Sequence, residues 1–404
     1  MKLLALTNLY PPQELGGYGR CIADFVWGLQ ERGHHLEVLT CDEPHLGERS
    51  THGPSGERVH RELRLKGTYQ GGVSPLQDPA ACAAIDQSNA LAISVLFEKA
   101  GPFDGVLVGN LDLLGLESLQ PLLPFGIPLL HHVGFVTPPF PPSWLPQSQH
   151  YQLVAASHCV RKSLEQAGFP ANLPVVYPGA RCELFGQEPT GRALPTPLDG
   201  RQLAPGQLGT RAQPLKICFA GLLMGSKGAH TLVSALALLR KRGRHLQGHL
   251  AGGRFQSGYS EQLQAVLDAH GLSDVRLVGQ LHRDSLARLF RLHHVCVFPS
   301  IHPEAFGIVG AEAMASGLAL ISSGVGGASE LFDDQVSGLR FQAGNADDLA
   351  NKLEWLCHNP ERLIAIAREG ERVAQERFSV RASAQQLEAL FSQTVQNHGD
   401  VLWL

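Results

Sequence analysis

Two glutamates separated by seven residues stand in the segment PSIHPEAFGIVGAEAMASGLALISSGVGGASE. Glu304 follows the apolar run VCVF, and Glu312 lies in a helical pattern that opens around Phe306 to Ile308 and ends near Gly317. The amino end of such a helix presents free backbone N–H groups and favours a phosphate, while flanking carboxylates can bind neutral hydroxyls. An arbitrary pair of glutamates is more often two exposed helix charges. The combination here nevertheless indicates a sugar-nucleotide site.

A lysine and two glycines supply the groups that an anionic ligand would need. Lys227 stands in the GSKG loop before a helix, where a cation would stabilise a departing diphosphate. The loop lacks the spacing of a Walker A motif, so a solvated lysine is the alternative. Gly16 and Gly17 lie between the first strand and the first helix, where backbone N–H groups can approach a phosphate or simply form a tight turn.

The elements that position these residues follow an α/β pattern. Short apolar runs alternate with helical periodicity along the whole chain, which is typical of doubly wound parallel sheets covered by helices on both faces. The expected strands are 3–7, 35–40, 106–108, 128–133, 153–156 and 175–177, followed by LKICFAG, QGHLAGG, VRLVG and VCVFPS. The expected helices include one ending at Gly33, then 228–242, 261–270, 284–292 and mostly helical chain after Asn345.

A length of 404 residues predicts two domains, because one hydrophobic core rarely keeps growing beyond about 300 residues. The N-terminal domain is expected over 1–185 and the C-terminal domain over 215–377. The segment 186–214 is rich in Pro and Gly without apolar periodicity, so it is expected to be a linker. A final helix over about 378–404 is expected to pack back on the N-terminal domain.

Composition excludes several classes of protein. Hydrophobic residues make up 44% and charged residues 17%, with a net charge of -4, so no nucleic-acid partner is expected. Eight scattered cysteines without a C-x-x-C pair indicate reduced thiols and a cytoplasmic location. The N-terminus is interpreted as a first strand and not a signal peptide. No apolar run approaches the roughly 18 residues that span a bilayer, so any membrane association would be peripheral.

Metal-binding patterns are missing from the sequence. No two aspartates are separated by a single residue, and neither H-E-x-x-H nor paired C-x-x-C occurs. We therefore expect no metal and no cofactor, with Lys227 and helix amino ends doing the work that a divalent ion does elsewhere.

The motifs together resemble the family 4 retaining glycosyltransferases, which have the two-Rossmann-domain architecture called GT-B. The resemblance covers most of the chain. It includes PPQELGGYG, AASHCVRKSLEQAGF, VVYPGA, FAGLLMGSKG, VRLVGQLHRDSLARLF and the two-glutamate segment, in the order that the family has them. It implies two doubly wound domains facing across a cleft.

The resemblance also implies roles for individual residues. Glu304 would contact the donor sugar near its reacting end, Glu312 the ribose hydroxyls, and Lys227 the diphosphate. A histidine at the end of an N-domain strand would lie in the cleft close to the sugar. Strand alternation puts one of His131 and His132 in the crevice and the other on the opposite face, and His132 is favoured because it is nearer the end of the strand. The implied donor-binding residues are Gly16, Gly17, Gly221, Lys227, Gly279, Glu304, Ala305, Phe306, Gly307, Ile308 and Glu312.

One position departs from the family pattern. Leu222 stands where an arginine usually contacts the diphosphate, and leucine cannot supply that bidentate donor. Either Arg254 or Arg181 could substitute, or donor binding could be weaker. The middle segment reads YPGA, where the family commonly has an asparagine and an acidic residue.

The expected activity is metal-independent transfer of a sugar from a nucleoside-diphosphate sugar, most commonly a uridine diphosphate sugar in this family, to an acceptor hydroxyl. The resemblance implies attack from the face that the nucleotide leaves, with retention of configuration. Rival interpretations are a GT-B epimerase, a phosphorylase and a non-catalytic sugar-nucleotide-binding protein. Loops over 45–76 and 136–147 are expected to contact the acceptor. The sequence encodes neither the identity of the acceptor nor the oligomeric state.

Overall fold

The computed structural model describes residues 1–186 and 207–399. Residues 187–206 and 400–404 lie outside the described residues, and with them most of the expected linker 186–214. The expected linker therefore stays a prediction.

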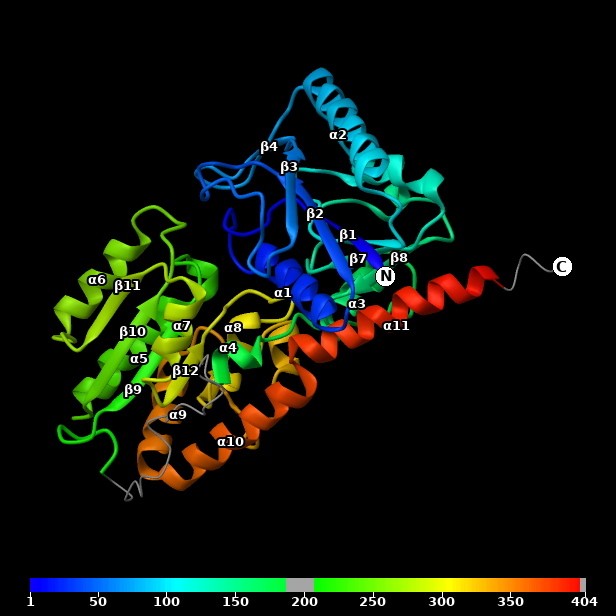
Figure 1. Ribbon diagram of the computed structural model, residues 1–404. Helices are drawn as coiled ribbons and strands as arrows, with labels where there is room; N and C mark the ends of the chain where they lie inside the picture. The colour runs from blue at the N-terminus through cyan, green and yellow to red at the C-terminus, as the bar shows by residue number, and fades with distance from the viewer. Residues whose placement is uncertain (187–206, 400–404) are drawn as a thin grey trace. The chain divides into compact units, whose positions relative to one another are not determined.

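The chain divides into two compact units, each built around its own sheet (Figure 1). Unit 1 consists of Met1–Gly179 with Val380–Leu404, and unit 2 of Ala180–Ser379. The chain thus leaves unit 1 after Gly179 and returns to it at Val380, while the expected boundaries lie at 185 and 378.

Unit 1 contains a six-stranded, entirely parallel sheet in the order β3-β2-β1-β6-β7-β8. The strands are β1 Lys2–Leu6, β2 His35–Cys41, β3 Arg58–Leu63, β6 Gly105–Val108, β7 Leu129–Val133 and β8 Tyr151–Ala155. Its helices are α1 Tyr18–Glu31, α2 Pro79–Ala100, α3 His158–Gln166 and α11 Val380–Gly399, with 3-10 helices η1 Leu116–Phe125 and η2 Pro142–Trp144. A small hairpin pairs β4 Gly67–Thr68 with β5 Ser74–Pro75.

Unit 2 repeats the same topology in the order β11-β10-β9-β12-β13-β14, again entirely parallel. The strands are β9 Leu215–Ala220, β10 Leu246–Ala251, β11 Val275–Gly279, β12 Val295–Phe298, β13 Ala319–Ser322 and β14 Leu339–Arg340. The helices are α4 Cys182–Gly186, α5 Ala229–Lys241, α6 Tyr259–Ala269, α7 Arg283–Phe290, α8 Ile308–Ala315, α9 Ala346–His358 and α10 Pro360–Arg377, with η3 Gly225–Lys227 and η4 Gly327–Glu330. Both sheets are doubly wound, which confirms the expected fold class.

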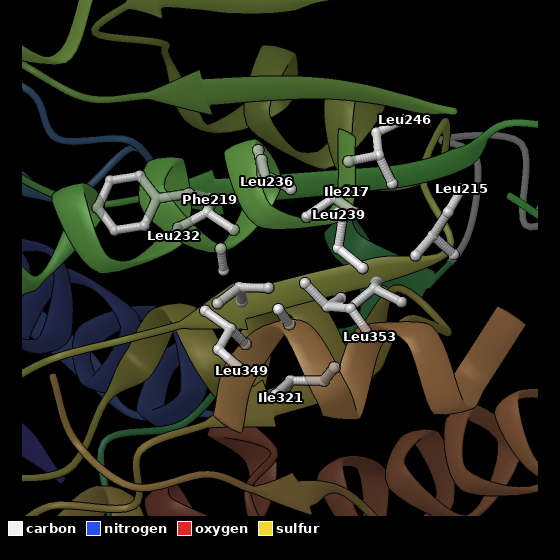
Figure 2. Packing of buried hydrophobic residues seen from close by; sticks show 14 of the residues in the cluster. Leu215, Ile217, Phe219, Leu232, Leu236, Leu239, Leu246, Ile321, Leu349 and Leu353 are labelled. Atoms are coloured by element: carbon white, nitrogen blue, oxygen red, sulfur yellow. The ribbon is translucent and has the colours of Figure 1, made fainter. Parts of the chain in front are cut away.

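A hydrophobic core holds the unit 2 sheet against helices α5 and α9 (Figure 2). Alternate β9 residues share one face of the sheet, and Cys218 on the opposite face is also fully buried. Each buried aliphatic side chain contributes about 1.5–3 kcal/mol, so this layer fixes the strand ends that carry the site. The labelled members are Leu215, Ile217, Phe219, Leu232, Leu236, Leu239, Leu246, Ile321, Leu349 and Leu353.

The expected strand 175–177 is wrong. Val175 makes only an isolated bridge with Ala155, and Val176 donates its N–H to the same residue at 3.0 Å. Pro174 and Pro178 flank this segment, and a proline offers no N–H to a ladder. The chain therefore crosses the edge of the sheet without extending it.

Part of the expected loop 45–76 is strand β3, and the following helix α2 was not expected. The buried residues Ile93, Leu96 and Phe97 pack α2 on unit 1. The side chain of Asn89 binds both backbone groups of Arg64, since its Oδ1 accepts the N–H at 2.8 Å and its Nδ2 donates to the carbonyl at 2.9 Å. By length and composition alone α2 could cross a membrane, and 22% of its apolar stretch is buried in the structure. A single helix of this kind is weak evidence for a membrane span, since core helices of soluble proteins pass the same test.

The last helix, α11, packs against α1 within unit 1. A side chain on Gly28 of α1 would lie 2.8 Å from the Cβ of Ala384, so the two helices approach closely there. Glu388 of α11 accepts hydrogen bonds from Arg32 Nε at 2.7 Å and pairs with His34 Nε2 at 3.0 Å. Helix α11 is thus an integral part of unit 1.

Candidate functional site

Glu304 lies in the connection from β12 to α8, at the carboxyl edge of the unit 2 sheet. Its N–H donates to the carbonyl of Val325 at 3.2 Å, and its carbonyl accepts from the N–H of Gly327 at 2.7 Å. Between them, Gly326 has φ 66°, and a Cβ there would lie 2.5 Å from the Glu304 carbonyl oxygen. A glycine is therefore required at position 326 for the loop after β13 to form both main-chain hydrogen bonds with Glu304.

The structure brings Glu304 together with Lys227. The ammonium of Lys227 lies 2.7 Å from Oε1 and 2.9 Å from Oε2 of Glu304. The side chains are 29% and 14% exposed, respectively, so the pair is partly desolvated but open to a ligand. Ser300 Oγ also donates to Oε1. The carboxylate is thus oriented by one cation and one hydroxyl.

The loop that carries Lys227 is fixed against the strand end that carries Glu304. Ile301 donates its N–H to the carbonyl of Ser226 at 2.8 Å, and Gly225 donates to Oε1 of Gln256 at 2.9 Å. Gly228 follows Lys227 with φ 71°, and a Cβ there would lie 1.9 Å from the carbonyl oxygen of Pro299. The ion pair therefore depends on close contact between two backbones.

Replacing Gly228 with alanine should disrupt this contact. We expect a loss of free energy of unfolding that exceeds by at least about 1 kcal/mol the loss in Gly243→Ala, measured by urea denaturation. Gly243 is a matched control, because its φ of 79° is similar but nothing would lie within 4 Å of a Cβ at that position. Equal losses in the two variants would show that backbone strain alone, and not the Pro299 contact, matters.

The amino end of α8 lies beside this pair. Its N-cap is Gly307, with φ 107° and no side-chain cap, so the N-cap residue itself makes no side-chain hydrogen bond to the first N–H groups of the helix. The helix begins at Ile308, within the expected range, and Ala305 precedes it in the same connection. The ring of Phe306 is buried and meets Phe378 edge-on at 5.4 Å, so this side chain serves packing and only its backbone could face a ligand.

Glu312 lies one turn into α8, which begins at Ile308. Its side chain is 0% exposed, and Oε1 lies 3.1 Å from an Nη of Arg283, whose side chain is 18% exposed. The Arg283 guanidinium also lies 5.6 Å from the ring centroid of Phe185. Sequence reasoning missed Arg283, since a lone arginine in HRDSL carries no local sign that it meets a residue 29 positions later.

The expected substitutes for an arginine at Leu222 differ in their placement. Arg254 pairs its backbone with Leu223, next to Leu222, but its side chain is 77% exposed and bound to Glu261 at 3.1 Å. Arg181 stands half-buried directly before α4.

Two of the predicted donor-binding glycines lie where strands of the unit 2 sheet end. Gly221 follows β9 and Gly279 closes β11, with φ values of 158° and 73°.

In unit 1, Gly16 and Gly17 form the turn into α1, with Gly16 at φ 66° and Gly17 as the N-cap without a side-chain cap. The chain before this turn is fixed by Arg61, a buried cation that sequence reasoning missed. Its guanidinium donates to the carbonyls of Tyr10 at 2.9 Å and Pro11 at 2.7 Å. Three further bonds reach Gln13, Cys41 and Ser50. Burial lowers the pKa of Arg61, but arginine remains charged in proteins.

Both candidate histidines are buried in unit 1, His131 at 2% exposure and His132 at 1%. His131 Nδ1 lies 2.7 Å from the Tyr151 hydroxyl, and His132 Nε2 lies 2.9 Å from the Val176 carbonyl, which makes this nitrogen the donor. Burial lowers the pKa of His131 to about 3 and that of His132 to about 4. Both rings are therefore neutral near pH 7, and the choice between them stays a prediction.

Within the described residues, no group of three or more His, Cys, Asp or Glu side chains is arranged to hold a metal ion. None of the eight cysteines forms a disulfide bond there.

Comparison with known proteins relates this arrangement to glycosyltransferases. Residues 201–373 match the family described as "Glycosyl transferases group 1". A D-inositol 3-phosphate glycosyltransferase of Saccharomonospora viridis is 32% identical over 226 residues, 54% of this chain and 49% of that protein. The enzyme of the same name from Arthrobacter sp. is 35% identical over 156 residues, 38% and 37% of the respective chains. The chain spans about half the length or less of these curated relatives.

Solved structures extend the likeness in fold to almost the whole chain. The sucrose-phosphate synthase of Thermosynechococcus elongatus superposes with a TM-score of 0.74 at 20% identity, over 98% of this chain and 100% of that one. Anabaena HepE in complex with UDP and glucose gives a TM-score of 0.68 at 21% identity, over 97% and 99%. The fold is therefore GT-B. At this identity the likeness shows the fold alone.

Proposed function

We propose that this protein is a retaining glycosyltransferase of the family 4 type, which moves a sugar from a nucleoside-diphosphate sugar to an acceptor hydroxyl. The observation that carries the proposal is the Lys227–Glu304 ion pair beside the uncapped amino end of α8. A cation, a carboxylate and free N–H groups at the carboxyl edge of a doubly wound sheet suit a ligand with both a diphosphate and sugar hydroxyls. The match of residues 201–373 to group 1 glycosyltransferases supports it.

In the proposed reaction, Lys227 and the α8 amino end bind the diphosphate and stabilise the charge that develops as it leaves. Glu304 binds hydroxyls of the donor sugar, and its pairing with Lys227 keeps the carboxylate oriented. Glu312, held by Arg283, binds the ribose. The acceptor hydroxyl attacks from the face that the diphosphate leaves, and the departing phosphate oxygen takes its proton, so configuration is retained.

The proposal includes a metal-independent mechanism and a cytoplasmic location. A lysine and helix N–H groups can neutralise a diphosphate without a divalent ion. It also includes a UDP-sugar as the donor, which is supported by the complexes of the structurally similar HepE with UDP and UDP-glucose. Lys227 would neutralise more of the diphosphate charge than usual, since Leu222 provides no cation.

A donor screen tests this function directly. The full chain is titrated calorimetrically with UDP, ADP and GDP, and the corresponding glucose nucleotides are incubated with a panel of acceptors in the presence of EDTA. We expect micromolar to millimolar binding of one nucleoside diphosphate and transfer that EDTA does not inhibit. Binding without transfer or donor hydrolysis would indicate a non-catalytic protein, and a new sugar isomer from donor alone would indicate an epimerase. Transfer that EDTA abolishes would reject metal independence.

A further inference from the structure

Three polar side chains of unit 1 converge on Asp112. Its Oδ1 accepts hydrogen bonds from the Tyr69 hydroxyl at 2.7 Å, from Asn110 Nδ2 at 2.5 Å and from Asn8 Nδ2. The donors are 6%, 8% and 1% exposed, respectively, whereas Asp112 is only half-buried. A carboxylate whose one oxygen accepts three neutral donors is fixed in orientation.

This cluster lies where an open α/β sheet keeps its ligand crevice. Asn8 comes two residues after β1 and Asn110 two residues after β6, and these neighbouring strands mark the point where the strand order reverses. The backbones meet as well, since Asn8 donates its N–H to the Asn110 carbonyl at 2.9 Å. Ligands bind outside the carboxyl ends of strands at such a switch point.

The loop that presents Asp112 has an unusual backbone. Leu113 has φ 57°, a left-handed conformation that costs a residue with a branched side chain on the order of 1 kcal/mol or more. Its carbonyl accepts the N–H of Lys66 at 2.5 Å, and the N–H of Asp112 donates to Asn110 Oδ1 at 3.1 Å. Several contacts therefore hold a strained loop in one conformation, as at many ligand sites.

The charge of Asp112 has no partner within the described part of the chain. No ion pair there involves Asp112, and the hydrogen bonds to its carboxylate all reach Oδ1, which leaves Oδ2 for a ligand. The ammonium of Lys66, next to this loop, is bound by Asp86 at 3.0 Å and Glu117 at 2.9 Å. The hydroxyl of Thr7, beside Asn8, is buried without a hydrogen-bond partner among the described residues.

We propose that Oδ2 of Asp112 accepts a hydrogen bond from a hydroxyl of the acceptor, so that this subsite selects a neutral polyhydroxylated acceptor. A carboxylate that pairs with no cation among the described residues repels a phosphate, so a phosphorylated substituent is excluded at this position. The inference rests on the proposed function and adds the class of acceptor to it. The relatives named for inositol 3-phosphate match only about half of this chain, so they do not fix its acceptor.

The test compares two probes that differ by one phosphate, myo-inositol and myo-inositol 3-phosphate, with methyl glucoside as a second neutral probe. Binding to the full chain is followed by saturation-transfer NMR, and transfer is assayed with the donor that the nucleotide screen identifies. We expect the wild type to prefer the neutral probes. Asp112→Asn keeps an oxygen for the three donors but replaces Oδ2 with an amide donor, so it should weaken neutral-probe binding at least about tenfold. Binding of UDP should not change.

Asp104→Asn is the matched control, because Asp104 is an exposed carboxylate of the same unit. It lies directly before β6, at the opposite edge of the sheet, and accepts the N–H of Lys2. It should bind every probe like the wild type. Equal neutral-probe binding by Asp112→Asn and wild type, preference for the phosphorylated probe, or no binding of any neutral probe would overturn the proposal. Should Asp112→Asn not fold, Asp112→Glu replaces it, since it displaces the carboxylate and should also weaken neutral-probe binding.

The two proposals fail in different experiments. If no nucleoside diphosphate binds, the glycosyltransferase function fails, while Asp112-dependent binding of myo-inositol would still establish a polyol site. If the donor binds and reacts but Asp112→Asn leaves acceptor selectivity unchanged, only the acceptor subsite is rejected.

Discussion

Replacing Glu304 with glutamine should reduce sugar transfer by about 10²–10³-fold, because a preorganised charged group at the reacting sugar is lost. The amide can still accept the hydrogen bond from Ser300, but it no longer pairs with Lys227, whose ammonium lies 2.7 Å from the native carboxylate. The change should appear in kcat with the identified donor. Free energy of unfolding should fall by only about 1 kcal/mol, since the pair is partly exposed.

The control for this prediction is Glu361→Gln, in the first turn of α10, where the carboxylate is exposed. Its kcat should equal that of the wild type. Calorimetric titration with UDP separates the roles further, because Glu304 is assigned to the sugar and Lys227 to the diphosphate. Glu304→Gln should bind UDP within a few-fold of wild type, whereas Lys227→Met should bind it at least about tenfold more weakly. A kcat within twofold of wild type for Glu304→Gln would remove it from the reaction.

Much of the fold could be predicted because doubly wound sheets have strong local signals. The apolar runs at β1, β9 and β12 were predicted to within about two residues, since buried parallel strands are continuous in Val, Ile and Leu. β3 and α2 were missed for a physical reason. RVHREL mixes charges with apolar residues at a sheet edge, and the apolar residues of α2 are spread around the helix without a clear apolar stripe. Their placement depends on contacts that distant residues supply.

The candidate site was predictable in its residue types but not in its contacts. Glu304 and Lys227 were both predicted from their motifs, yet their direct ion pair depends on the backbone contact between Gly228 and Pro299. Arg283 and Arg61 were missed because their partners lie far away in sequence. A long-range pair of this kind leaves no periodic pattern, whereas glycines at positive φ, such as Gly307, can be suspected from the sequence alone.

Removing Arg283 should have the second large effect, on both stability and nucleotide binding. Glu312 is fully buried, and its Oε1 lies 3.1 Å from an Nη of Arg283. Deleting one member of a buried ion pair leaves a buried charge without that partner, which typically costs about 3–5 kcal/mol. Arg283→Met should therefore lower the free energy of unfolding by about 3 kcal/mol in urea denaturation. Arg276→Met, at an exposed position of β11, should leave it unchanged.

A double-mutant cycle isolates this ion pair. If the cost of Arg283→Met comes from the charge on Glu312, then adding Glu312→Gln should recover part of the lost stability, with a coupling of about 1–3 kcal/mol. Additive losses would show that Arg283 acts through packing on Phe185, 5.6 Å from its guanidinium. Arg283→Lys keeps the charge but not the planar fork, so it should lie between wild type and Arg283→Met.

Ligand binding then decides what Arg283 does for the site. If it positions Glu312 for the ribose, Arg283→Met should weaken UDP binding about tenfold, reduce the preference for UDP over its 2'-deoxy analogue, and leave inorganic pyrophosphate binding unchanged. If Arg283 instead replaces the phosphate-binding arginine that Leu222 lacks, pyrophosphate binding should weaken as much as UDP binding, and the preference for the ribose hydroxyl should persist. Because the ion pair already occupies one carboxylate oxygen of Glu312, the structure favours the first result.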